Sequence, residues 1–282
     1  MIQFKKINAL QSYLNQQRMN GKKIGFVPTM GALHAGHISL LETARKACDL
    51  LVCSIFVNPT QFNDPKDFEK YPITLDTDIK LLASANTDIL FLPNVTELYP
   101  EGTAQLEKYP LDFLEQILEG EFRPGHFQGV CQVMKRLLDA VEPEKLFMGQ
   151  KDYQQCMVVQ RLLDITGKRI ELITCPTIRE PDGLAMSSRN RRLSPEAREK
   201  AIGIYKTLEY INANLKKGHL DSLLKEAHTL LEKTGFQIEY ITLANAKSLE
   251  IRNEWDGSSE MVCLIAAFLD GVRLIDNMVI SK

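Results

Sequence analysis

Apolar runs alternate with helix-like patterns through residues 1–175 of the chain. The apolar run Leu50–Val57 suits a strand that is covered on both faces. Other strand-like runs occupy residues 24–27, 89–92, 145–148 and 170–174, and helix-like stretches occupy residues 38–45, 75–84, 130–141 and 153–166. Strands and helices in this order predict an α/β domain with a mostly parallel, Rossmann-like sheet. We expect its ligands to gather at the carboxyl ends of the strands.

The pattern changes after residue 175. The stretch PTIREPDGLAMSSRNRRLSP is rich in proline and arginine and poor in large apolar residues, which is typical of a long functional loop or hinge. Helix-like stretches follow at residues 195–217 and 220–234, and strand-like runs at residues 237–243, 261–269 and 272–275. Residues 176–282 are therefore predicted to form a hinge loop and a small α+β domain, which we expect to act as a lid.

Composition narrows the class of protein. With 44% hydrophobic and 25% charged residues the chain is typical of soluble globular proteins, and its net charge of −2 offers no overall attraction to nucleic acid. Residues 1–23 lack the apolar core of a targeting segment, and the longest apolar stretch, Met261–Leu269, is too short to span a bilayer. The six cysteines form no C-x-x-C pair, which favours reduced thiols. We expect a cytoplasmic protein without a membrane or nucleic-acid partner.

The segment PTMGALHAGH, residues 28–37, joins the first apolar run to the following helix-like stretch. Two histidines three residues apart at a helix start, His34 and His37, share a face. Gly31 and Gly36 permit a ligand to approach the backbone closely. Backbone amides, the helix dipole and two imidazoles together predict a phosphate cradle. The alternatives are two surface histidines beside a turn, or a zinc site for which no third ligand is suggested.

Two further motifs follow predicted strands. FVNPTQF, residues 56–62, places the neutral side chains of Asn58 and Gln61 at the carboxyl edge of the sheet, although Asn-Pro alone indicates only a turn. GQKDYQQ, residues 149–155, offers a cation in Lys151 and a helix cap in Asp152. An ordinary capped helix explains the second motif equally well.

The segment MSSRN, residues 186–190, lies inside the predicted hinge loop. Two hydroxyls and a guanidinium suit a triphosphate, although a solvated basic loop has the same composition. Flanking arginines extend the segment into a local basic patch: Arg179, Arg191 and Arg192. Arg123 and His126, in RPGHF, are weaker candidates for a phosphate or dimer contact.

Together PTMGALHAGH, FVNPTQF, KDYQQ and DGLAMSSRN resemble the pantothenate synthetase (pantoate–β-alanine ligase) family, in that family's order and over essentially the whole chain. The paired histidines and MSSR also resemble the HIGH and KMSKS signatures of nucleotidyl-transferring enzymes. The resemblance implies ATP-dependent condensation of pantoate with β-alanine through pantoyl-adenylate, with release of AMP and pyrophosphate. Another HIGH-type enzyme, such as a small aminoacyl-adenylate-forming protein, is the alternative, and a non-catalytic nucleotide-binding module is a third interpretation.

The resemblance also assigns residues. It implies an ATP site formed by Met30, Gly31, Ala32, Leu33, His34, Ala35, Gly36, His37, Gly149, Gln150, Lys151, Asp152, Ile178, Met186, Ser187, Ser188 and Arg189. The residues expected to act in catalysis are His37, as proton donor, with His34, Lys151, Ser187 and Arg189. Substrate contacts are expected from Gln61, Gln155 and Asn58. Gln150 replaces the glutamate usual in the family, so only a backbone contact is expected there.

The same resemblance implies partners. Mg²⁺ is expected on the ATP phosphates, without a metal site made by the protein. A homodimer formed through the N-terminal domain is also expected.

Overall fold

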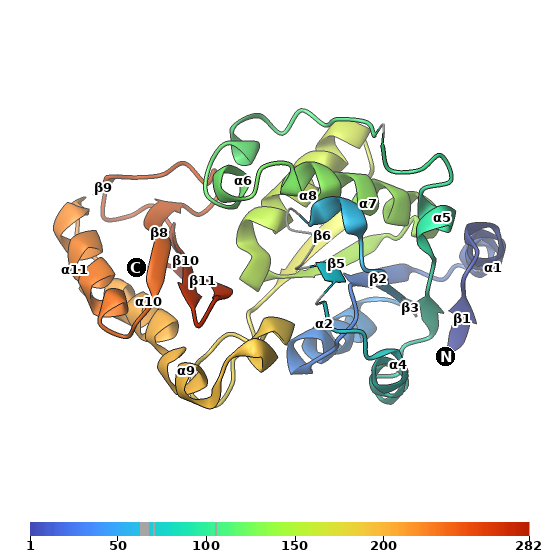
Figure 1. Cartoon of the computed structure of the whole chain (residues 1–282). Coiled ribbons are helices and arrows are strands. Elements are labelled where there is room, and N and C mark those ends of the chain that lie inside the picture. The colour runs from blue at the N-terminus through green and yellow to red at the C-terminus, as the bar shows by residue number, and fades with distance from the viewer. Residues whose placement is uncertain (63–67, 70, 105, 282) are drawn as a thin grey trace. The chain divides into compact units, whose positions relative to one another are not determined.

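The computed structural model describes residues 1–62, 68–69, 71–104 and 106–281. The chain divides into two compact units. Unit 1 comprises Met1–Gln150 and Gln154–Pro176, and unit 2 comprises Lys151–Tyr153 and Thr177–Lys282. Figure 1 shows the elements of both. Each unit is described by itself below.

Unit 1 is built on a six-stranded sheet in the order β1-β4-β3-β2-β5-β6, in which every neighbouring pair is parallel (Figure 1). The strands are β1 (Ile2–Phe4), β2 (Ile24–Thr29), β3 (Leu50–Ile55), β4 (Ile89–Phe91), β5 (Lys145–Gly149) and β6 (Glu171–Cys175). Every residue of β3 is buried, as its uninterrupted apolar run predicts. The predicted Rossmann-like parallel sheet is therefore confirmed.

Helices and short 3₁₀ segments connect these strands. The α-helices are α1 (Ile7–Met19), α2 (Ala35–Ala47), α4 (Leu75–Ser84), α5 (Val95–Leu98), α6 (Glu119–Phe122), α7 (His126–Val141) and α8 (Tyr153–Thr166), and the 3₁₀ segments are η1 (Pro59–Gln61), η2 (Asp112–Glu115) and η3 (Gln150–Asp152). Helix α4 matches its predicted bounds, whereas α7 begins four residues before its predicted start at residue 130. Sequence analysis missed β1 and α1 altogether.

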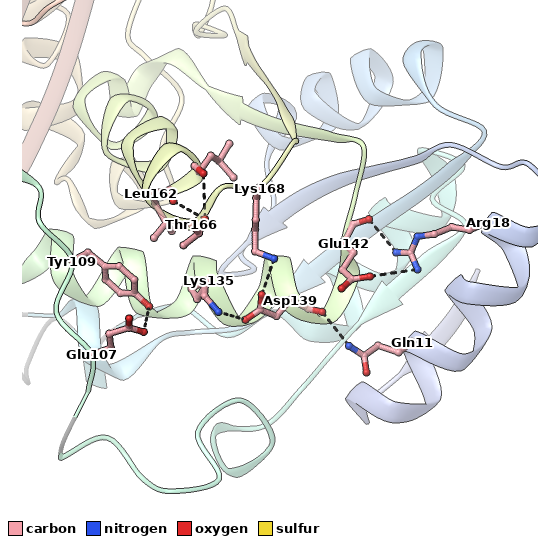
Figure 2. A network of polar contacts seen from close by, with 11 residues as sticks. Gln11, Arg18, Glu107, Tyr109, Lys135, Asp139, Glu142, Leu162, Thr166 and Lys168 are labelled. Carbon is pink, nitrogen blue, oxygen red and sulfur yellow. Dashed lines mark hydrogen bonds and ion pairs between the residues drawn. The ribbon is translucent and has the colours of Figure 1, made fainter.

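Helix α1 is held against the end of α7 by polar contacts (Figure 2). The guanidinium of Arg18 donates to the carbonyls of Val141, at 2.5 Å, and Glu142, at 3.0 Å, and Gln11 donates to the carbonyl of Asp139 at 3.0 Å. The last carbonyls of a helix have no partner within the helix. Helix α1 therefore supplies donors that the end of α7 needs.

Unit 2 contains a three-stranded antiparallel sheet in the order β11-β10-β8 and a separate pair, β7 with β9. The strands are β7 (Gly218–His219), β8 (Gln237–Asn245), β9 (Glu254–Trp255), β10 (Met261–Leu269) and β11 (Val272–Ile280). The helices are α9 (Pro195–Lys200), α10 (Gly203–Asn214) and α11 (Asp221–Glu232), with the 3₁₀ segment η4 (Ser188–Arg192) before them. Helices beside an antiparallel sheet confirm the predicted α+β class.

Two boundaries in unit 2 differ from the prediction. The single helix predicted over residues 195–217 is two helices, with Gly203 at the break, where an added Cβ would lie 2.7 Å from Oγ1 of Thr234. The strand predicted over residues 272–275 extends to Ile280, because a tight turn at Asp270 and Gly271, with φ of 52° and 69°, pairs all nine residues of β10 with β11. Among the described residues, no helix is both long enough and apolar enough to cross a bilayer.

Candidate active site

The turn between β2 and α2 is fixed by a carboxylate from α4. Gly31 and Ala32 both adopt positive φ, 81° and 50°. The amides of Ala32 and Leu33 donate to the two oxygens of Asp78 at 2.9 and 2.8 Å, and the hydroxyl of Thr74 donates to one of them at 3.1 Å. An added Cβ at Gly31 would lie 3.1 Å from Asp78, so backbone conformation and close approach both favour glycine there. Asp78 is 1% exposed, and sequence analysis missed it.

The two histidines of this turn cap helix α2 reciprocally. His34 is the N-cap residue, and its Nδ1 accepts from the amide of Gly36 at 3.2 Å. His37 lies three residues into the helix, and its Nδ1 accepts from the amide of His34 at 3.3 Å. The ring centroids are 4.1 Å apart. The predicted proximity is thus present, but it comes from a capping box and not from a shared helical face, because His34 precedes the helix.

The capping box also fixes the tautomer of both rings. A ring nitrogen that accepts from a backbone N–H carries no hydrogen of its own. Each neutral imidazole therefore has its hydrogen on Nε2. His34 and His37 are donors at Nε2 as a consequence of the way in which the chain folds at the start of α2.

Four backbone amides of the turn already have acceptors. Those of Ala32 and Leu33 donate to Asp78, that of His34 to His37, and that of Gly36 to His34. The predicted phosphate cradle would therefore have to use donors other than these four amides. The segment also carries the imidazole Nε2–H groups of His34 and His37 as donors.

Asn58 and Gln61 both lie in the segment after β3. Asn58 binds the side chain of Gln61, the last residue of η1. Nδ2 of Asn58 donates to Oε1 of Gln61 at 3.2 Å, and Nε2 of Gln61 lies 3.1 Å from Sδ of Met30. The structure therefore brings Gln61 to the histidine-bearing segment, as the parallel sheet predicts. Asn58 is 1% exposed and bonded internally, which differs from its predicted role as a substrate ligand.

The start of α7 supports the same segment from behind. An added Cβ at Gly129 would lie 2.2 Å from the carbonyl oxygen of Thr60, so η1 approaches α7 only because residue 129 is glycine. Nδ1 of His126 hydrogen-bonds the carbonyl of Gln61 at 2.8 Å, and its Nε2 lies 3.2 Å from Arg123. His126 is buried, so its predicted role in a phosphate or dimer contact is replaced by support of Gln61.

Neighbouring glutamines of α8 have different environments. The side chain of Gln154 is buried, accepts from the amide of Glu119 at 3.1 Å, and donates to the carbonyls of Leu114 and Ile117. Gln155 is half-buried. The structure thus assigns Gln154 to packing and leaves Gln155, the predicted pantoate ligand, with access to solvent.

In unit 2, an arginine and a buried carboxylate anchor the predicted hinge loop. Arg179 forms two hydrogen bonds with Asp276, at 2.6 and 3.1 Å, donates to the carbonyl of Gly183, and stacks on the ring of Tyr205 at 4.3 Å. Burial raises the pKa of Asp276, and Arg179 opposes that rise. Arg179 is therefore a structural anchor, and its inclusion in the predicted basic patch is wrong.

The loop itself is folded back on Arg179. The amide of Met186 donates to the carbonyl of Ile178 at 3.0 Å, and Oγ of Ser187 accepts from the amide of Arg189 at 3.3 Å. Residues 188–192 form η4, so part of the segment predicted as a long functional loop or hinge has regular structure. In the same unit, Asn277 donates to the carbonyl of Lys151 at 2.9 Å, which fixes the backbone of that residue beside β11.

Comparison with known proteins identifies the family. The family model for pantoate-beta-alanine ligase matches residues 2–279. The chain belongs to the pantoate–β-alanine ligase family. A pantothenate synthetase of Cytophaga hutchinsonii is 44% identical over an alignment of 283 positions, which covers 99% of each chain. The crystal structure of pantothenate synthetase from Thermus thermophilus is 37% identical, with a TM-score of 0.87 and 99% of each chain covered.

A second solved structure bears on the substrates. The pantoate-beta-alanine ligase of Francisella tularensis, crystallised as a complex with "Beta-gamma ATP and Beta-alanine", is 38% identical, with a TM-score of 0.83 over 99% of this chain and 97% of that chain. These likenesses support a ligase of this family, and they do not support the aminoacyl-adenylate-forming alternative.

The six cysteines have the environment expected for a packing role. All six are free thiols, and five are buried. Burial raises the pKa of Cys53 to about 12, so its thiol stays protonated and unreactive.

Proposed function

We propose that this chain condenses pantoate with β-alanine in two steps, forming pantoyl-adenylate and pyrophosphate from pantoate and ATP, and then pantothenate and AMP. The observation that carries the proposal is the capping box of His34 and His37, which makes both rings Nε2–H donors. The family likeness supports the substrates, as does the relative from Francisella tularensis that was crystallised with an ATP compound and β-alanine.

In the first step the carboxylate oxygen of pantoate attacks the α-phosphorus of ATP, and the bond to pyrophosphate breaks. This carboxylate is ionised at neutral pH, so no general base is needed. The barrier is lowered by positioning and by donors to the phosphate oxygens, where negative charge develops. We assign those donors to His37 and His34, with Lys151, Ser187 and Arg189.

The remaining residues assigned to ATP stay predictions. The amides of Ala32 and Leu33 are bonded to Asp78, so any contact of theirs with ATP would use other atoms. The same predictions cover the segments Met30–His37, Gly149–Asp152 and Met186–Arg189, and the backbone at Ile178.

We assign pantoate recognition to Gln61 and Gln155 because both are neutral. The substrate is an anion that reacts beside a triphosphate, so its site needs donors without further negative charge. An amide supplies a donor to the carboxylate and an acceptor for a hydroxyl.

In the second step the neutral amine of β-alanine attacks the carbonyl carbon of pantoyl-adenylate, AMP leaves with the bonding electron pair, and the attacking nitrogen releases one proton to solvent. The intermediate must be protected from water. A lid role for residues 176–282 would provide that protection, and it stays a prediction.

Mg²⁺ is proposed to enter with ATP and to neutralise part of the phosphate charge. The described residues hold no group of three His, Cys, Asp or Glu side chains that would bind a metal ion, so phosphate oxygens are its proposed ligands. We also propose a cytoplasmic location, consistent with six free thiols, and a homodimer, to be tested by light scattering after gel filtration.

Pantoate-dependent exchange of labelled pyrophosphate into ATP tests the first step directly. We expect exchange with pantoate and none with proteinogenic amino acids. His37→Ala should raise the barrier by about 2–4 kcal/mol through loss of one donor. Exchange that depends on an amino acid, or normal exchange in the variant, would contradict the proposal.

A further inference from the structure

Gln61 is joined to a buried tyrosine by a short chain of hydrogen bonds. The hydroxyl of Tyr99 donates to Oδ1 of Asn58 at 2.8 Å, and Nδ2 of Asn58 donates to Oε1 of Gln61 at 3.2 Å. Tyr99 is 2% exposed and comes from the residue after α5, far from Gln61 in the sequence. The guanidinium of Arg136 lies 4.5 Å from the centre of its ring.

The orientation of the Asn58 amide is decided by its neighbours. The carbonyl of Gly129, an acceptor only, lies 3.0 Å from Nδ2, and the amide of Thr60, a donor only, lies 3.4 Å from Oδ1. Exchanging the oxygen and nitrogen of Asn58 would place like groups against both. Burial raises the pKa of Tyr99, so its hydroxyl keeps the proton that it donates.

The orientation of Asn58 fixes that of Gln61 in turn. Because Asn58 presents N–H to Gln61, the atom of Gln61 that faces it must be the acceptor Oε1. Nε2 of Gln61 then faces the other way, where its described partner is the thioether of Met30, at 3.1 Å. A thioether is a weak acceptor, which a carboxylate readily replaces.

We propose that Tyr99 is a positioning residue that acts through Asn58 to hold Gln61 with its amide nitrogen turned toward the anionic substrate. This rests on the proposed binding of pantoate by Gln61. Without the Tyr99 hydroxyl, Oδ1 of Asn58 keeps only the longer bonds from Thr60, at 3.2 and 3.4 Å. Nδ2 of Asn58 still donates to the carbonyl of Gly129 at 3.0 Å, so the amide keeps its orientation, but it is held less firmly and its 3.2 Å bond to Gln61 weakens. Gln61 then spends part of its time with Oε1 toward the substrate, where it repels a carboxylate.

A double-mutant cycle tests the proposal, with pantothenate formation by the full-length enzyme as the assay. Tyr99→Phe should raise the KM for pantoate about fivefold, which corresponds to one ordinary hydrogen bond, and should leave the KM for ATP unchanged. In a Gln61→Ala background, Tyr99→Phe should change the KM for pantoate less than about twofold, because the group that it orients is gone.

Tyr109→Phe is the matched control. Tyr109 is also buried, and its hydroxyl donates to Glu107 at 3.0 Å, outside the chain of bonds that leads to Gln61. This control should leave the KM for pantoate unchanged. If Tyr99→Phe does not fold, Thr60→Val removes the 3.2 Å bond to Asn58, and the same cycle should show a smaller effect that is again lost with Gln61→Ala.

Two results would overturn the proposal in distinguishable ways. An equal effect of Tyr99→Phe with and without Gln61, or no effect at all, would exclude positioning through Asn58 and leave pantoate binding by Gln61 intact. An unchanged KM for pantoate in Gln61→Ala alone would remove both the assignment of Gln61 and the positioning role built on it.

Discussion

Two buried aspartates each anchor one segment of the molecule. Asp78 anchors the turn between β2 and α2, Asp276 anchors the loop that begins at Arg179, and the two bind different partners. In unit 1, Asp78 binds the amides of Ala32 and Leu33 and the hydroxyl of Thr74, all of them uncharged. In unit 2, Asp276 binds the guanidinium of Arg179, and it also accepts from the main-chain amide of the next residue in β11, Asn277, at 2.8 Å. The two aspartates are almost equally inaccessible, 1% and 2% exposed, so the difference lies in what they hold.

The partner determines what is made rigid. Amides belong to the main chain, so Asp78 fixes the backbone from which His34 and His37 begin their capping box. A guanidinium ends a long side chain, so Asp276 fixes the head group of Arg179 and only indirectly the loop around it. A carboxylate bound to backbone amides is suited to a segment that must position donors accurately. A carboxylate bound to a guanidinium is sufficient for a loop that folds back on one side chain.

The largest effect is expected from Asp276→Ala. Removing the carboxylate leaves Arg179 mostly buried without its anionic partner, which should lower the free energy of unfolding by about 3–5 kcal/mol. Trp255, the only tryptophan of the chain, is buried in unit 2, so its fluorescence during urea denaturation reports this loss.

Asp182→Ala is the control for that variant. It breaks the pair of Asp182 with Arg198, at 2.6 Å, in which both side chains are about a third exposed. An exposed pair contributes about 0–1 kcal/mol. Equal losses in the free energy of unfolding would show that burial does not make the Asp276–Arg179 pair more stabilising than the exposed pair.

Asp78→Asn should have the next largest effect. An asparagine has one acceptor oxygen, so one of the two amides would face an NH₂ group and be left buried without a partner, at a cost of about 1–3 kcal/mol. Because the turn carries both histidines, a displacement of about 1 Å should also lower kcat/KM by about 100-fold.

Chemical denaturation followed by far-ultraviolet circular dichroism, together with the exchange assay, measures both effects. Asp76→Asn, at an exposed position of the same helix, should change stability by less than about 0.5 kcal/mol and leave exchange unaltered. If both variants behave alike, Asp78 does not fix the turn.

The comparison also explains which parts of the site the sequence could predict. The proximity of His34 and His37 follows from local spacing, and the meeting of Gln61 with Met30 follows from parallel strands. Asp78 lies 46 residues beyond Ala32, and its contact depends on how α4 packs against the sheet. Its spacing from Leu75 and Leu82 places Asp78 on the buried face of α4, unlike the exposed Asp76, but that spacing does not identify the amides that Asp78 binds.

Asp78 was missed by the sequence analysis, whereas Arg179 was noticed but given the wrong environment. Its neighbours in the sequence are polar and predict an exposed basic patch, whereas a carboxylate 97 residues away binds it. Helix α1 was missed although Leu10 and Leu14, four residues apart, are its buried positions. The Asn and Gln residues of the same helix obscured a signal that the spacing carried: Asn8, Gln11, Asn15, Gln16 and Gln17.

The smallest effect, and the sharpest test of how Asp78 acts, is expected from Thr74→Val. Threonine and valine have nearly the same shape, so the change removes the 3.1 Å hydrogen bond to Asp78 and little else. Thr74 is the N-cap residue of α4, but among the described residues its side chain makes no capping bond, so no cap is lost. We expect a loss of about 0.5–1.5 kcal/mol in stability and no change in pyrophosphate exchange, since both amides keep their acceptor.

Thr77→Val makes the same substitution at an exposed position of α4 and corrects for the effect of valine on the helix. Each variant's loss in free energy of unfolding is measured relative to its own control. If that loss is as large for Thr74→Val as for Asp78→Asn, the hydroxyl and not the pair of amides secures the carboxylate. The contrast with Asp276 would then be one of side-chain partners, neutral against charged, and Asp78 would no longer be a main-chain anchor.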